Sequence, residues 1–137
     1  MVVGRVAEGF GTMNLNMKIL IVDDFATMRK ILKNVLTQIG FKNIGEAEDG
    51  ESALGALKKD HYDLILCDWS MPEMPGLELL GKIKSDDKLK EIPFIMVTAE
   101  AKKDKILEAV KAGVSNYIVK PFTTETVDEK LKQTFDS

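Results

Sequence analysis

The sequence predicts an α/β fold in three layers, a doubly wound five-stranded parallel sheet with helices on both faces. Short apolar runs alternate along the chain with longer segments whose apolar residues recur every three or four positions. The central runs are apolar on both faces, as in parallel strands that are covered on both sides. Alternating strands and helices build a doubly wound sheet, and right-handed crossovers leave little choice of topology.

The first half of the domain contains two predicted strands and two predicted helices. Residues 18–22 form a β-branched run that is too short for a helix, and residues 44–47 read as an edge strand. The first helix can end at Gly40, and its apolar positions are Phe25, Met28, Leu32, Val35, Leu36 and Ile39. Asp49-Gly50 turns into the second helix, which uses Ala53, Leu54 and Leu57.

The second half continues the alternation. Pro72 and Pro75-Gly76 shape the loop that follows the third strand. The predicted elements are, in order, a strand over 63–67, a helix marked by Leu77, Leu79, Leu80 and Ile83, a strand over 93–97, a helix over 101–112 that ends at Gly113, a strand over 116–119 and a helix over 123–135.

Composition excludes several classes of protein. A net charge of −3 argues against a nucleic-acid-binding protein. No apolar run approaches the roughly 18 residues that span a bilayer. Residues 1–16 lack a continuous apolar segment, so we interpret them as a flexible extension rather than a secretory signal, before a domain over 17–137. A cytoplasmic location is therefore the default expectation. The single cysteine, Cys67, is predicted to be a buried, unreactive thiol.

Four of the predicted strands end in reactive polar residues. Asp23 and Asp24 follow the first strand, and Asp68 follows the third. Thr98 and Lys120 follow the fourth and fifth. Ligands of open α/β sheets bind beyond the carboxyl ends of the strands, where these groups would converge. Adjacent carboxylates are costly to bury without a cation, and Mg²⁺ favours oxygen ligands beside phosphate. The pattern predicts a site for a divalent metal and a phosphoryl group.

Each residue also has a simpler interpretation. Asp24 could cap the first helix. Asp68 could be a nucleophile toward phosphorus or only a third metal ligand. Lys120 alone would usually be a solvated surface charge, and Thr98 alone says little. The combination at carboxyl ends favours the phosphate-handling site.

The motifs Val22-Asp23-Asp24, Asp68 followed by Met71-Pro72 and Gly76, Thr98-Ala99 and Lys120-Pro121-Phe122 resemble the receiver domain of two-component response regulators. The resemblance covers roughly residues 18–135 and is greatest to the chemotaxis members of the family. The stretches that carry it are Val22-Asp-Asp-Phe-Ala-Thr-Met-Arg29, Glu46-Ala-Glu-Asp-Gly50, Met96-Val-Thr-Ala-Glu-Ala-Lys-Lys103 and Tyr117-Ile-Val-Lys-Pro-Phe-Thr123. It implies a flavodoxin-like sheet of order 2-1-3-4-5.

The resemblance also implies roles for individual residues. Asp68 would be the phosphoacceptor, and Lys120 and Thr98 would bind the phosphoryl oxygens. Mg²⁺ would be held by Asp24, Asp68 and the backbone carbonyl of Ser70, with Asp23 assisting through water. Tyr117 would turn inward on activation. Ser70 replaces an asparagine of enteric chemotaxis receivers and, with Glu100, is expected to influence the dephosphorylation rate.

The implied function is a monomeric, stand-alone switch that assists its own phosphorylation and dephosphorylation without being an enzyme. Its partners would be a histidine kinase of the CheA type and the flagellar motor switch, with a phosphatase left open and neither nucleic acid nor membrane expected. A phosphorelay intermediate or a regulator of a non-flagellar partner is the alternative. The expected partner surface comprises Lys103, Ile106, Val110, Tyr117, Val119, Phe122 and Lys130.

Overall fold

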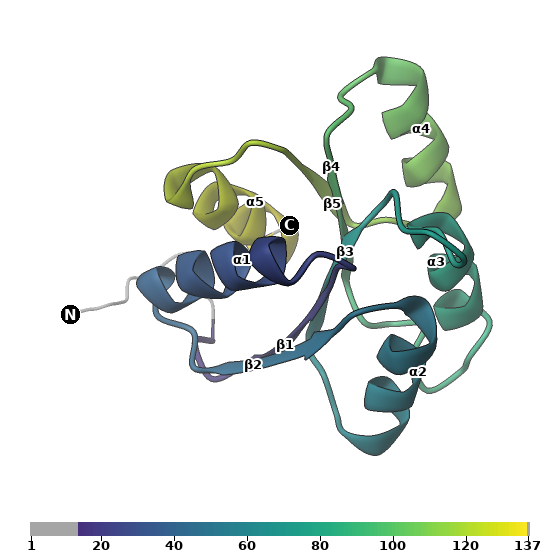
Figure 1. Ribbon diagram of the computed structural model, residues 1–137, viewed down its shortest axis with the longest axis horizontal. Coiled ribbons are helices and arrows are strands. Elements are labelled where there is room, and N and C mark those ends of the chain that lie inside the picture. Colours follow the sequence, from purple (N-terminus) through teal and green to yellow (C-terminus); the bar gives the residue numbers. More distant parts are fainter. Residues whose placement is uncertain (1–13, 137) are drawn as a thin grey trace.

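The computed structural model describes residues 14–136, which form alternating strands and helices (Figure 1). Asn14 to Asn16 form a turn, and the Asn16 carbonyl accepts a hydrogen bond from Asn43. The rest of the expected extension, residues 1–13, lies outside the described residues. The elements are β1 (Lys18–Val22), α1 (Ala26–Ile39), β2 (Asn43–Ala47), α2 (Gly50–Lys59), β3 (Leu64–Asp68), α3 (Gly76–Lys84), β4 (Phe94–Thr98), α4 (Lys103–Ala112), β5 (Asn116–Val119) and α5 (Thr124–Asp136).

The five strands are parallel and lie in the order β2-β1-β3-β4-β5, which confirms the predicted topology. Helices α1 and α5 cover one face of the sheet, and α2, α3 and α4 cover the other (Figure 1). Alternate residues of each central strand enter two separate cores. Ile19 and Ile21 of β1 pack with α1 and α5, whereas Leu20 and Val22 pack with the other three helices.

The central strands β1, β3 and β4 are therefore buried on both sides. Strands β3 and β4 are buried along their whole length, and Asp68 and Thr98 are their last residues. Both strands thus run one residue beyond the predicted ends. A rigid, doubly covered sheet holds these two polar side chains at its carboxyl edge, which is where a site needs fixed geometry.

Local signals explain three of the helix ends. Gly40 and Gly113 follow α1 and α4 with φ angles of 126° and 113°, which favour glycine. Asp49 accepts a hydrogen bond from the Ser52 amide at 2.8 Å, and the Ser52 hydroxyl accepts one from the Asp49 amide at 3.3 Å, in a reciprocal cap. The prediction for α4 was wrong at its start, because the helix begins at Lys103 and not at residue 101.

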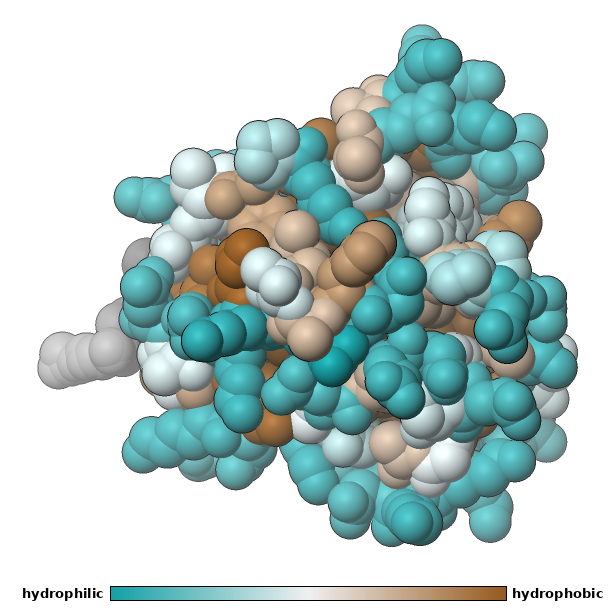
Figure 2. Space-filling view, in the orientation of Figure 1, coloured by the Kyte–Doolittle hydropathy of each residue, from teal (hydrophilic) through white to brown (hydrophobic). Residues whose placement is uncertain are grey.

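No helix of the described part is long and apolar enough to cross a membrane. On the face shown in Figure 2, hydrophilic side chains predominate. Apolar side chains reach the surface in this view mainly around α1. Phe25, which precedes α1, and Ile31 of α1 are exposed.

Gly76 sits where the loop after β3 closes against the start of α3. Its amide donates to the carbonyl of Trp69, and a Cβ atom here would lie 2.6 Å from Trp69 Cε3 and 3.1 Å from the Asp68 carbonyl oxygen. We expect Gly76→Ala to lower the free energy of unfolding by about 1–3 kcal/mol, measured by urea denaturation, because a tightly packed contact must open. Gly81→Ala is the matched control on the same helix, where a Cβ meets nothing within 4 Å, and should leave stability unchanged or raised. Equal effects at the two positions would contradict the prediction.

Candidate functional site

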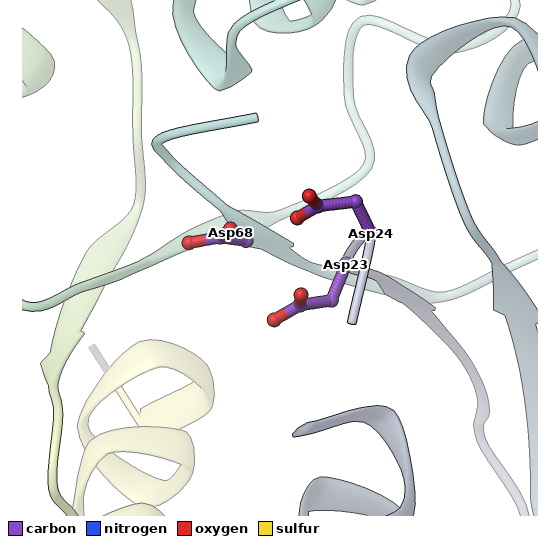
Figure 3. Close-up of side chains that lie close together, drawn as sticks. All are labelled: Asp23, Asp24 and Asp68. Atoms are coloured by element: carbon purple, nitrogen blue, oxygen red, sulfur yellow. The ribbon is translucent and has the colours of Figure 1, made fainter. Parts of the chain in front are cut away.

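Three carboxylates gather at the carboxyl edge of the sheet. Asp23 and Asp24 follow β1, and Asp68 ends the neighbouring strand β3, whose Cys67 lies opposite Val22. One oxygen from each carboxylate lies within 4.8 Å of the other two. In Figure 3 the three carboxylates point to the same side of the chain. The predicted convergence of these residues is therefore present.

The hydrogen bonds and the cation that the protein supplies do not fully compensate the negative charge of the three carboxylates. Asp23 is fully buried, and its Oδ1 accepts a hydrogen bond from the Phe25 amide at 2.9 Å. Asp23 Oδ2 and Asp24 Oδ1 are buried oxygens without a hydrogen-bond partner among the described residues. Burial raises the pKa of Asp23, and the charges of Asp68 and Asp24 add to this, while the Phe25 amide and Lys120 oppose it. Unpartnered carboxylate oxygens are unfavourable unless a cation is present, so the donor set fits a hard divalent metal.

Asp24 does not cap α1. The N-cap residue is Phe25, which makes no side-chain capping hydrogen bond. The interpretation of Asp24 as a helix cap is therefore wrong, and its carboxylate lies in the cluster with Asp23 and Asp68.

Lys120 is the cation that the chain itself contributes. It follows β5, and its amide donates to the carbonyl of Thr98 at 2.7 Å. Its Nζ lies 3.0 Å from Asp68 Oδ1 and 3.7 Å from Asp23 Oδ2. The side chain is 19% exposed, so the alternative of a solvated surface lysine is also wrong. An ammonium group held here can bind an anionic group that is added to Asp68.

Thr98 is buried at the end of β4, next to the strand that carries Asp68. Its Oγ1 accepts a hydrogen bond from the Glu100 amide at 3.1 Å and lies 3.3 Å from the Glu100 carbonyl. The hydroxyl is thus engaged with its own loop. Ser70 and Glu100 are both exposed, and Glu100 pairs with Lys102 at 3.6 Å.

Tyr117 on β5 is half-buried, and the Lys130 ammonium lies 3.9 Å from the centre of its ring, within the range of a cation–π contact. On α4, Val110 is 53% exposed and Ile106 is half-buried. Leu107, which the sequence analysis missed, is 49% exposed one turn from Val110. Lys103 is exposed, whereas Val119, Phe122 and Lys130 are half-buried.

Two charged residues that the sequence analysis left without a role also reach the site region. Arg29 on α1 donates to the backbone carbonyl of Asp23 at 2.7 Å and pairs with Glu46 of β2 at 3.1 Å. The spacing of residues in the sequence does not predict the contacts of Arg29, because they join α1, the segment after β1 and β2. Beside Asp24, a pocket of about 180 Å³ is lined by Asp24, Glu48, Asp49, Met71, Pro72 and Glu73.

Comparison with known proteins gives a consistent result. The family model of the response regulator receiver domain matches residues 19–132. The chemotaxis protein CheY-3 of Vibrio cholerae is 55% identical over 124 residues, which cover 90% of this chain and 95% of that protein. The structure of V. cholerae CheY4 has a TM-score of 0.81 at 31% identity and covers 87% of this chain and 98% of that one.

A receiver domain of a sensor histidine kinase from Pseudomonas aeruginosa has the same fold, with a TM-score of 0.79 at 24% identity. The match covers 89% of this chain and 99% of that one, and that protein was solved with a magnesium ion in its active-site cleft.

Proposed function

The chain belongs to the response regulator receiver family, and from this premise we propose that it is a CheY-like switch that is phosphorylated on Asp68. The donor is the phosphohistidine of a CheA-type kinase, in the cytoplasm. The observation that carries the proposal is the contact between Asp68 and Lys120 beside two buried carboxylate oxygens that have no hydrogen-bond partner among the described residues.

Asp24 and Asp68 would hold Mg²⁺ together with the backbone carbonyl of Ser70, and Asp23 would assist through water. When bound, the metal supplies charge neutralisation for oxygens of the transferring phosphoryl group. The acidic cluster fits this cation because its oxygens converge within 4.8 Å. The magnesium-bound kinase receiver supports the proposal by analogy.

In the proposed reaction, an Asp68 oxygen attacks phosphorus, and the bond between phosphorus and the donor nitrogen breaks. The electron pair of that bond stays on the imidazole, which takes up a proton. Lys120 starts the reaction bound to Asp68 Oδ1 and can move to a phosphoryl oxygen, so its charge stabilises both states. The chain therefore assists its own phosphorylation without being an enzyme in the usual sense.

The switch follows from the added charge. A phosphoryl group brings about −1.5 to −2 charges and strong hydrogen-bond acceptors. We propose that Thr98 leaves its contact with Glu100 to donate to this group, and that Tyr117 then turns inward from beneath Lys130. Such a change requires two packings of similar free energy, of which the phosphoryl group selects one by its contacts.

We propose the flagellar motor switch as the partner, because chemotaxis proteins are the relatives with 55% identity. The surface formed by Lys103, Ile106, Val110, Tyr117, Val119, Phe122 and Lys130 would bind it, with Leu107 added from the structure. Ser70 and Glu100 lie at the exposed margin of the site and would set the rate of dephosphorylation, alone or with a phosphatase.

The proposal is tested by measuring binding to the motor switch protein with and without an acyl-phosphate mimic such as beryllofluoride. We expect the mimic to strengthen binding at least about tenfold, which corresponds to 1.4 kcal/mol. Tyr117→Ala should keep labelling by a phosphodonor but lose most of this gain. Tyr62→Phe, at a buried tyrosine in the loop between α2 and β3, is the control and should keep the full gain. Transfer of the phosphoryl group to a histidine phosphotransfer domain, with no gain in motor binding, would favour the phosphorelay alternative.

A further inference from the structure

The backbone of Asp23 is tied to the edge strand β2 at both of its polar groups. Its amide donates to the carbonyl of Ala47 at 3.1 Å. Its carbonyl accepts a hydrogen bond from Arg29 Nη1 at 2.7 Å, and Arg29 Nε lies 3.1 Å from Glu46 Oε1. Ala47 and Glu46 are consecutive residues of β2. The segment after β1 that carries Asp23 and Asp24 is therefore held to β2 twice, directly through Ala47 and through Arg29 bound to Glu46.

Arg29 is well placed to hold this geometry. Its side chain is only 16% exposed, and its guanidinium makes two contacts at once in a planar fork. Asp23 and Asp24 lie where the extended strand has ended and the helix has not begun, so no sheet or helix hydrogen bond accounts for the Asp23 carbonyl. The hydrogen bond from Arg29 replaces the missing one and limits rotation of the peptide that joins the two aspartates.

We propose that Arg29, anchored by Glu46, is a positioning residue that holds Asp23 and Asp24 in the arrangement needed to bind a divalent cation. The proposal rests on the proposed function, since it assigns a support for the same metal site. Among the described residues, Arg29 makes its side-chain contacts with the Asp23 carbonyl and with Glu46, and not with the carboxylates of Asp23 or Asp24. It acts through the backbone, as residues outside the ligand set orient metal ligands in other proteins.

Positioning and simple electrostatics predict opposite results for the removal of Arg29. If Arg29 acted only as a nearby positive charge, its loss would strengthen the binding of a cation, because a repulsive charge has gone. If it positions the aspartates, its loss weakens binding. The sign of the change therefore separates the two explanations.

The experiment measures the Mg²⁺ dissociation constant by titrating Trp69 fluorescence, with calorimetry as a second readout. Trp69 is half-buried beside Asp68, so its emission reports on the site. We expect Arg29→Met, which keeps the apolar stem, to raise the dissociation constant about tenfold. Arg29→Lys keeps the charge but not the fork, and should resemble Arg29→Met.

Lys33→Met is the matched control. Lys33 lies one turn further along α1 and also approaches Glu46, at 3.7 Å, but it is not among the donors to the Asp23 carbonyl. The substitution Lys33→Met removes the same charge from the same helix as Arg29→Met. The Mg²⁺ dissociation constant of Lys33→Met should stay within about twofold of the wild type. Glu46→Ala should weaken Mg²⁺ binding, and the double variant with Arg29→Met should bind no more weakly than Arg29→Met alone, because both changes release one clamp.

Each outcome has a distinct meaning. Binding by Arg29→Met that equals or exceeds that of the wild type overturns the positioning proposal and leaves the proposed function intact. Absence of saturable Mg²⁺ binding by the wild type overturns the metal site itself. A urea denaturation curve for each variant without Mg²⁺ shows whether it is folded. If Arg29→Met unfolds, Arg29→Gln takes its place; it lacks both the charge and the reach of Nη1 to the Asp23 carbonyl and should bind Mg²⁺ more weakly than the wild type.

Discussion

Replacement of Asp68 by asparagine is expected to reduce labelling by a small acyl phosphate donor to background. The carboxylate oxygen is the proposed nucleophile, and an amide of nearly the same shape cannot form an acyl phosphate. Asp68 is 5% exposed and ends a strand that is buried along its length, so the substitution leaves the surrounding packing in place. Labelling is followed by mass spectrometry of the intact protein in the presence of Mg²⁺.

Two controls give this result its meaning. Asp104→Asn changes an exposed carboxylate in the first turn of α4 and should label like the wild type. Wild-type protein treated with a chelator should label far more slowly, because the carboxylates then lack the cation that offsets their repulsion of the phosphodonor. Persistent labelling of Asp68→Asn would show that another residue is the phosphoacceptor.

Replacement of Asp23 by asparagine is expected to raise the stability of the metal-free protein and to weaken Mg²⁺ binding. Asp23 is fully buried, and its Oδ2 has no hydrogen-bond partner among the described residues, although Lys120 Nζ lies 3.7 Å away. Two other carboxylates are close by. Removal of this charge at neutral pH should raise the free energy of unfolding by about 1–3 kcal/mol, the usual cost of a buried unsatisfied polar group. The measurement is urea denaturation in the presence of a chelator.

The pH dependence follows from the direction of the pKa shift. Because the pKa of Asp23 is raised in the folded state, the folded protein holds its proton more tightly than the unfolded chain does. The destabilising contribution is absent below the unfolded pKa, near 3.8, and grows as the pH rises through the folded pKa. The stability gain of Asp23→Asn should therefore be present at neutral pH and vanish in acid.

Added Mg²⁺ should reverse the order of the two proteins. The wild type gains stability that increases with the logarithm of its affinity for the cation, and the variant gains less. Asp63→Asn is a useful comparison, because Asp63 accepts a hydrogen bond from the Lys18 amide, which lowers its pKa. That substitution should destabilise the protein with or without Mg²⁺. A metal-free Asp23→Asn protein that is less stable than the wild type would show that the cluster is not strained by its charge.

The sequence was sufficient to predict the order of elements and the meeting of Asp23, Asp24, Asp68 and Lys120 at one edge of the sheet. The uninterrupted apolar runs indicated strands covered on both faces, and the polar residues at their ends indicated a common edge. It misjudged the start of α4, because the pattern of residues 101–112 is helical throughout while Ala101 and Lys102 lie outside the helix. It did not single out Arg29 or Leu107, because helical spacing does not show which side chains reach another element or solvent.

The sequence thus determined which strands form and in what order. It also determined which carboxylates, hydroxyl and lysine stand at their ends. These features depend on hydrophobic periodicity and residue type, which are properties of neighbouring residues. Tertiary structure alone decided that the Lys120 ammonium pairs with Asp68 and that Arg29 joins the Asp23 carbonyl to Glu46 of β2. These contacts depend on the register and crossing of elements far apart in the chain. The packing of the two hydrophobic cores against one sheet fixes these contacts, and no single segment of the sequence determines that packing.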